Sequence, residues 1–257
     1  MKLFSIYFIF SVHLLLFVQS SDELEKSYNI LRRQFDQLKA DKKTYSKEII
    51  SLAIKIKEAM EASEISDLIS NKLNELKSDL PLSVRVIIWN ENTHIFNKHY
   101  SKEYLYAVYD GSLYDDQRRY VFMWIPGGRH RHGEWEFSTL NKGETFLIRN
   151  VEYKEYMYAV ANSLAYDSSR RRIFTWRPKS SDGCEWYLEI ISGNEIRLKF
   201  KTFNEYFYAG EDSTLQNSEK RNVFTWRPSQ SCDNTCIWRL SPEGEGKESH
   251  QLTGQTM

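Results

Sequence analysis

Three polar turns contain the residues best suited to binding chemistry. Their sequences are YDDQRRY, YDSSRRRI and NSEKRNV, and in each an acidic residue precedes neighbouring bases. A guanidinium binds sulfate or phosphate through paired hydrogen bonds, so three equivalent turns at one end of a fold predict a basic ring that holds such groups. The alternative is that the bases pair with acidic residues of the same turns. The candidate binding residues are Arg118, Arg119, Arg171, Arg172, Lys220 and Arg221.

No motif for enzyme chemistry accompanies these turns. The chain has no G-x-S-x-G, no H-E-x-x-H and no phosphate-cradling glycine loop, so we expect a non-enzymatic protein without a cofactor. His130 and His132 in GGRHRHGE lie beside arginines whose charge opposes a metal cation, and we expect no metal site there. Because histidine titrates near pH 6.5, this loop is predicted to become more basic at lower pH.

The polar turns belong to a threefold internal repeat. KEYLYAV, KEYMYAV and NEYFYAG begin at Lys102, Lys154 and Asn204, which are 52 and 50 residues apart. The hexapeptides VFMWIP, IFTWRP and VFTWRP keep the same spacing, and a second tryptophan follows each of them. Each copy contains four candidate strands with no helical pattern between them. The repeat predicts an all-β β-trefoil domain. Its predicted boundaries are 83–241, with repeats of about 91–140, 141–191 and 192–241.

The hexapeptides are expected to supply the core of this domain. Alternate residues of a strand face opposite sides, so the phenylalanine and the tryptophan of each hexapeptide share one face and can fill a pseudo-threefold interior. Proline ends each strand because it cannot donate to a continuing ladder. The alternative is an exposed aromatic platform for a ligand. The predicted core residues are Phe122, Trp124, Phe174, Trp176, Phe224 and Trp226.

The first residues predict export from the cell. An apolar run from Leu3 to Val18 follows a lysine and precedes small residues suited to cleavage after Ser20, which is typical of a signal peptide. We therefore expect residues 1–20 to be removed and the mature chain to be extracellular, without a membrane span.

Residues 21–82 predict helix. Apolar residues recur in heptads from Leu24 to Ala59. One helix over residues 22–60 would be too long to lie wholly against the repeat domain, so this seam needs another helix. Either the following segment supplies it within a helical hairpin, or two chains pair as a coiled coil. VRVIIWN, which comes next, is predicted to be a strand. Either that strand or Trp238–Ser241 would close the barrel.

The three cysteines predict one disulfide in an oxidising compartment. Cys232 and Cys236 in CDNTC are close enough in sequence to pair. Cys184 is left over, either as a free buried thiol or in a bridge to another chain. Residues 242–257 are polar and predict a flexible tail.

Composition and repeats together indicate a class of protein. The chain of 257 residues has 35 basic and 35 acidic residues, so its net charge does not steer it toward nucleic acid. The leader, the helical segment and the EY-x-YA and FTW repeats resemble the thirty-kilodalton haemolymph proteins of moths, the microvitellogenin type. The resemblance implies a secreted insect protein of haemolymph, egg or saliva, with roles in storage, lipid or carbohydrate carriage and microbial glycan recognition.

The leading hypothesis is a secreted, non-enzymatic binding protein. Its repeat domain would engage a glycan, an anionic polysaccharide or an extracellular protein, and pairing of chains through the helical segment would raise avidity. The alternatives are a haemolymph or egg storage or lipid-carrying protein without a specific glycan ligand, and a serine-protease inhibitor. Ricin-type lectins carry a Q-x-W signature, and the glutamine is missing before Trp135, Trp186 and Trp238, so no lectin site residue can be transferred.

Overall fold

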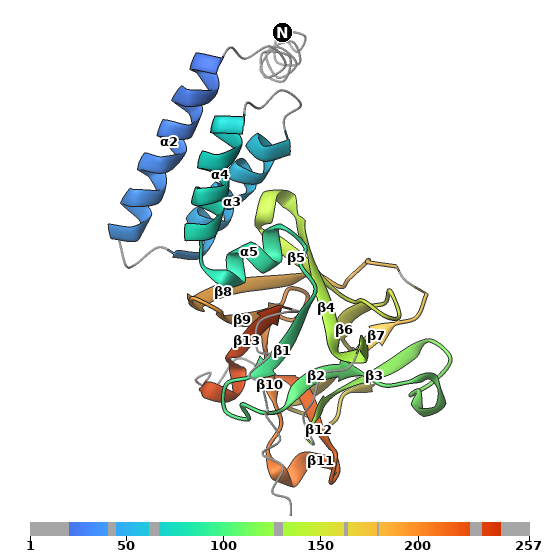
Figure 1. The fold of residues 1–257 in the computed structure, drawn as a ribbon. Coiled ribbons are helices and arrows are strands. Elements are labelled where there is room, and N and C mark those ends of the chain that lie inside the picture. Colours follow the sequence, from blue (N-terminus) through green and yellow to red (C-terminus); the bar gives the residue numbers. More distant parts are fainter. Residues whose placement is uncertain are drawn as a thin grey trace, which may run out of the picture.

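Helices gather at one end of the molecule and strands at the other (Figure 1). The computed structural model describes residues 21–40, 45–61, 67–125, 131–161, 164–178, 180–226 and 233–242. The predicted signal peptide lies outside the described residues, as does the predicted tail beyond Pro242. Within the described ranges, no helix has both the length and the apolar character that a bilayer span requires.

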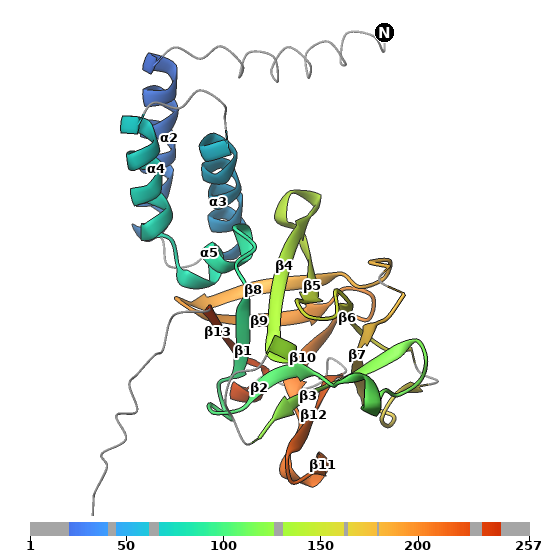
Figure 2. The ribbon, with the colours of Figure 1, turned by 45° about the vertical axis from the view of Figure 1, so that its right-hand side comes forward.

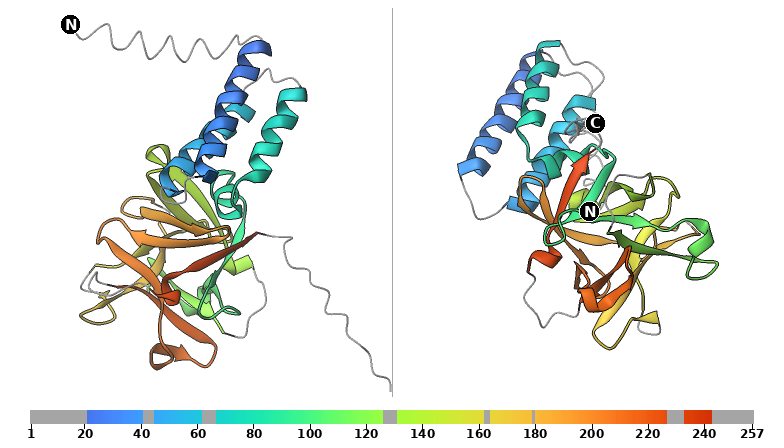
Figure 3. Two further views of the ribbon diagram at one scale, coloured as in Figure 1. Left: turned by 90° about the vertical axis from the view of Figure 1, so that its left-hand side faces the viewer. Right: turned by 60° about the horizontal axis from the view of Figure 1, so that its bottom comes forward.

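Four α-helices precede the strands within the described residues. They are α2 (Ser21–Ala40), α3 (Tyr45–Glu61), α4 (Asp67–Asp79) and α5 (Leu82–Ile88). Helices α2, α3 and α4 run side by side, and α5 lies between them and the strands (Figures 2 and 3). Four of the described seam positions are buried in this bundle, in one core with residues of α4. The buried apolar side chains are Leu31, Ile49, Leu52, Ile56, Ile69, Leu73 and Leu76.

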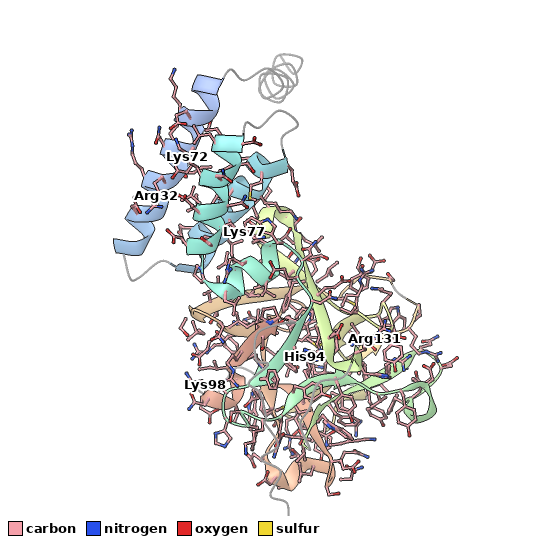
Figure 4. The ribbon with its side chains drawn as sticks, in the orientation of Figure 1. Arg32, Lys72, Lys77, His94, Lys98 and Arg131 are labelled. Atoms are coloured by element: carbon pink, nitrogen blue, oxygen red, sulfur yellow. The ribbon has the colours of Figure 1, made fainter. Side chains whose placement is uncertain are left out.

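Ion pairs join α2 to α4, and a glycine brings α3 onto the strands. Arg32 of α2 contacts Asp79 at 3.4 Å, and Lys72 of α4 pairs with Glu25 of α2 (Figure 4). At the turn after β4, Gly143 has φ of 84° and lies against α3, where a Cβ atom would stand 2.7 Å from Ile50. The helical bundle and the strand region therefore share one apolar core.

Thirteen strands follow within the described residues. Their bounds are β1 Thr93–Asn97, β2 Tyr104–Ala107, β3 Arg118–Trp124, β4 Glu134–Leu140, β5 Thr145–Asn150, β6 Tyr156–Ala159, β7 Arg170–Trp176, β8 Trp186–Ser192, β9 Glu195–Phe200, β10 Glu205–Ala209, β11 Leu215–Asn217, β12 Lys220–Trp226 and β13 Trp238–Pro242. All pairings are antiparallel, and they form one sheet that closes on itself because β1 pairs with β2, β4 and β13. The hairpins β2–β3, β6–β7 and β10–β12 meet where β3, β7 and β12 pair with one another.

The predicted fold class is wrong. We expected a coiled coil or a helical hairpin followed by a β-trefoil of three four-stranded repeats. Within the described residues, the structure is instead a closed ten-stranded antiparallel β-barrel in a sheet of thirteen strands, with four short helices. Helix α2 ends at Ala40 and α3 begins at Tyr45, so the described heptads do not form one straight helix, and α3 packs against α2, α4 and α5 of the same chain. The additional strand β11 pairs with β12.

The prediction of a strand for VRVIIWN is also wrong. Leu82–Ile88 is helix α5, and Val84, Val86, Ile87 and Ile88 are buried. A short, wholly apolar run has no period that separates a buried strand from a buried helix. Strand β13 pairs with β1 and β9 and thereby closes the barrel.

The second tryptophan of each repeat occupies the centre of the core. Trp135, Trp186 and Trp238 are fully buried. Each indole Nε1 donates a hydrogen bond to a backbone carbonyl of the preceding hairpin, at 3.0 Å to Leu105, 2.9 Å to Met157 and 3.1 Å to Phe207. In the hexapeptides the phenylalanines are buried, whereas Trp124, Trp176 and Trp226 are half-buried at the strand ends. The three copies are thus equivalent in three dimensions.

The cysteines are in two different states. Cys184 is free and 2% exposed, and burial raises the pKa of its thiol to about 12. Cys236 is disulfide-bonded. Its predicted partner Cys232 lies outside the described residues, so this pairing stays a prediction.

Candidate functional site

Three buried arginines join each repeat to the next. Arg119 of β3 reaches Glu155 at 2.9 Å, Arg171 of β7 reaches Glu205 at 2.9 Å, and Arg221 of β12 reaches Glu103 at 2.7 Å. All six residues are less than a tenth exposed. Each guanidinium also lies over an aromatic ring, 3.4 to 3.8 Å from the centroids of Tyr153, Phe203 and Tyr100. The pairs form a cycle. The arginine of the first repeat binds the glutamate of the second, that of the second binds the third, and that of the third binds the first.

The cycle is not the same in all three copies. Thr175 and Thr225 donate hydroxyl hydrogen bonds to Glu155 and Glu205, at 2.6 and 2.7 Å. Met123 stands at the matching position of β3, one residue before the terminal tryptophan, so no hydroxyl is available there for Glu103. Glu103 therefore accepts fewer hydrogen bonds than Glu205. Each hydrogen bond that a buried carboxylate accepts stabilises it, so Glu103 is the less stabilised of the two.

The predicted basic ring is therefore divided into inner and outer positions. Arg119, Arg171 and Arg221 are at most 6% exposed, and their guanidinium groups are engaged by carboxylates within the fold. Arg172 is half-buried and donates to the backbone carbonyls of Leu164 and Ala165, at 3.3 and 3.5 Å. Only the first position of each strand remains for binding chemistry.

The strand register places one cation opposite one tryptophan at each outer position. Arg118 pairs with Trp176 across β3 and β7, Arg170 with Trp226 across β7 and β12, and Lys220 with Trp124 across β12 and β3. Cross-strand neighbours of this kind have side chains on the same face within contact distance. Each outer site is therefore built from two repeats. Arg170 was missed as a candidate, although the 52-residue spacing from Arg118 identifies it.

In two copies an aspartate holds the arginine over the aromatic residues. Arg118 pairs with Asp115, and its Cζ lies 5.7 Å from the ring centroid of Trp176. Arg170 contacts Asp167 at 2.6 Å and lies 5.5 Å from the Phe224 centroid. At both sites the chain's own guanidinium lies over an aromatic ring.

The third copy replaces both members of that pair. Asn217 stands three residues before Lys220, where the other turns have aspartate. Its Oδ1 accepts the Glu219 N–H at 2.9 Å, the same turn contact that Asp115 makes with Gln117 at 2.9 Å. The turn is preserved without its charge, and Lys220 forms no ion pair with any described carboxylate.

A pocket of about 330 Å³ is open beside Lys220. Four aromatic side chains and one valine supply most of its surface, and three titratable side chains lie among them. Its lining residues are Tyr104, Tyr106, Val108, Tyr109, Trp124, His132, Glu219 and Lys220. Most of these residues belong to or adjoin β2, β3 and β12, and these strands lie at the end of the molecule away from the helices (Figure 1). The rings of Tyr106 and Trp124 cross at 78°, with centroids 5.5 Å apart.

One polar atom in the pocket wall has no partner within the described residues. Tyr106 is 8% exposed, and its hydroxyl forms no hydrogen bond there. Burial raises the pKa of this phenol, and no neighbouring cation opposes the rise. Burial also raises the pKa of the equivalent Tyr158, to about 12, but there the charge of Arg118 acts against it. The Tyr106 hydroxyl is therefore the one that lacks a guanidinium beside it.

The rim of the pocket has an exposed tyrosine that the other two repeats lack. Tyr109 is 59% exposed, and the repeat spacing places Ala161 and Glu211 at its counterparts. On another side His132 is held by a hydrogen bond of 2.5 Å between its Nδ1 and the Tyr153 hydroxyl. Gly133 lets the backbone pass Tyr104, because a Cβ atom would lie 2.1 Å from that ring.

A second, polar pocket of about 560 Å³ lies over the Arg119–Glu155 pair, with Asp110, Glu152 and Arg177 on its walls. Asp110 contacts Arg119 at 2.6 Å, and this hydrogen bond lowers the pKa of that carboxyl. The buried guanidinium of Arg119 therefore contacts both Glu155 and Asp110. Across the described ranges, no group of three or more His, Cys, Asp or Glu side chains is arranged to hold a metal ion.

No family model matches the chain, and no curated protein matches it. Solved structures with a similar fold include a salivary protein of the Cysteine and Tryptophan-Rich family from Culex quinquefasciatus (19% identity, 60% of this chain and 94% of that chain, TM-score 0.45). Others are the designed threefold-symmetric protein ThreeFoil (15%, 58% and 96%, 0.45) and a Polyporus squamosus lectin bound to a sialylated epitope (15%, 60% and 49%, 0.46). These likenesses assign neither a family nor a ligand, and the thirty-kilodalton haemolymph family is not shown.

Proposed function

We propose that this protein is an extracellular, non-enzymatic binding protein that holds a sugar residue in the aromatic pocket of its first repeat. The observation that carries the proposal is the open pocket of about 330 Å³ lined by Tyr104, Tyr106, Tyr109 and Trp124. Ring faces match the apolar C–H faces of a sugar, and a few polar groups fix the orientation of a ligand in such a pocket. Glu219, Lys220 and His132 supply those groups.

Two further features support this function. The disulfide at Cys236 fits an oxidising, extracellular compartment, as does the predicted signal peptide. At the counterparts of the pocket in the second and third repeats, the guanidinium groups of Arg118 and Arg170 lie over aromatic rings, so the proposed binding is one sugar per chain.

A glycan array followed by calorimetric titration tests the proposal. Trp124→Ala is expected to weaken binding of the best glycan by about tenfold or more, because it removes the stacking wall. Trp176→Ala is the matched control, since it makes the same truncation at a site filled by Arg118, and its affinity should equal that of the native chain. Equal losses in both variants, or no glycan bound, would overturn the proposal.

A further inference from the structure

The open pocket has a charge pattern that its two counterparts lack. At the other outer positions the cation is neutralised by Asp115 or Asp167 within its own turn. At Lys220 the turn residue is Asn217, and the lysine makes no ion pair with a described carboxylate. A half-buried lysine among four aromatic side chains, without an ion pair to a described carboxylate, suits an anionic partner.

The neighbouring groups favour a partner that also carries hydroxyls. Glu219 lines the same pocket without pairing with Lys220, and a carboxylate there accepts hydrogen bonds from ligand O–H groups. The Tyr106 hydroxyl is buried, lacks a partner among the described residues and can donate or accept. Together these groups suit a ligand ring that carries hydroxyl donors at one edge and a negative charge at another.

We infer that the pocket binds an acidic sugar, and that Lys220 pairs with the carboxylate or sulfate of that sugar while its ring lies against Trp124. This inference rests on the proposed function and names its ligand class. Asn217 is a positioning residue, because its neutral side chain leaves Lys220 available. Asn217→Asp would give Lys220 an ion-pair partner within its own turn. The turn should be kept, since Asp115 and Asp167 accept the same backbone N–H hydrogen bond in their turns.

The experiment compares three probes that share one ring: methyl β-glucoside, methyl β-glucuronide and glucose 6-sulfate. Saturation-transfer NMR and calorimetry measure their affinities for the native chain. We expect at least one acidic probe to bind about tenfold more tightly than the glucoside, as a charge-assisted hydrogen bond predicts. Which acidic probe binds better identifies a carboxylate or a sulfate as the preferred group.

Two variants assign the preference to the lysine. Lys220→Gln should bring the acidic probes to the affinity of the glucoside, and Asn217→Asp should do the same without touching the pocket wall. Lys55→Gln, a change of an exposed lysine on α3, is the matched control and should keep the preference. Circular dichroism checks that each variant is folded.

The outcomes separate the inference from the proposed function. If all three probes bind equally and Trp124→Ala weakens them all, the pocket binds sugars but the inference of an acidic ligand is overturned. If an acidic preference survives Lys220→Gln and Asn217→Asp, the role of Lys220 is overturned. If no probe binds and the glycan array is empty, both the inference and the proposed function fail.

Discussion

The inner and the outer positions of β3, β7 and β12 repeat to different degrees. At the inner positions all three copies have an arginine clamped by a glutamate of the next repeat. At the outer positions two copies have an arginine tied to an aspartate, and the third has Lys220 beside an open pocket. The inner ion pairs link the three repeats into a ring, and loss of one partner leaves an unpaired charge in the core. The outer positions carry no such constraint, and there one copy differs in a way that suits a ligand.

The largest expected effect comes from breaking the inner cycle. Glu205→Ala leaves the guanidinium of Arg171 buried without its partner, and removing one member of a buried pair costs about 3–5 kcal/mol. Urea unfolding measures the loss. A double variant, Arg171→Met with Glu205→Leu, should recover most of the free energy of unfolding because neither charge is left behind.

The control is an ion pair that is largely exposed to solvent. Arg131 and Glu152 approach to 3.1 Å, with 76% and 32% of their side chains exposed, so Glu152→Ala should cost less than about 1 kcal/mol. If Glu205→Ala also lowered the free energy of unfolding by less than about 1 kcal/mol, the structural role of the cycle would be contradicted.

Much of this cycle is visible in the sequence, but its meaning is not. The glutamates are the E of the repeated EY-x-YA motif and the arginines follow the same 52- and 50-residue spacing. Both sets can therefore be recognised from the repeat alone. That Arg119 reaches Glu155 of the next repeat, rather than an acid of its own turn, depends on how the hairpins meet, and three-dimensional contacts of this kind leave no local pattern.

Other features divide in the same way. Strands β5 to β8 all begin within the predicted second repeat, about 141–191, which matches the four candidate strands expected of each copy. Helix α5 was not predictable, because an apolar run without polar punctuation fits either state. The pocket could be suspected only from the differences among copies, at Tyr109, Asn217 and Lys220, and its openness follows from the absence of a guanidinium that sequence patterns do not locate in space.

A smaller effect is expected within the inner cycle itself. Thr225→Val removes the hydroxyl that donates to Glu205 at 2.7 Å and keeps the side-chain shape. A hydrogen bond to a buried charged group contributes about 1.5–3 kcal/mol, so urea unfolding should show a loss of that size.

The same measurement on Glu103→Ala, which has Met123 nearby instead of a threonine, should give a smaller loss than Glu205→Ala. Equal losses at the two glutamates would mean that the threonine adds nothing.

The smallest effect concerns the outer positions and their dependence on pH. Burial raises the pKa of Asp115 and Asp167, but the backbone N–H groups of the turns and the neighbouring guanidinium groups outweigh it, and both pKa values lie below the ordinary value. A carboxyl whose pKa is depressed on folding stabilises the protein above its unfolded value near 3.9, and this contribution is lost as the pH falls through the lower, folded value. Because both pairs are partly exposed, the expected change is below about 1 kcal/mol. Thermal melts between about pH 5 and pH 2 should therefore fall less steeply for Asp115→Asn with Asp167→Asn than for the native chain. Since Asn217 already lacks this charge, Asn217→Asp should make the fall steeper, and an unchanged slope in both variants would show that the aspartates do not hold the outer arginines in place.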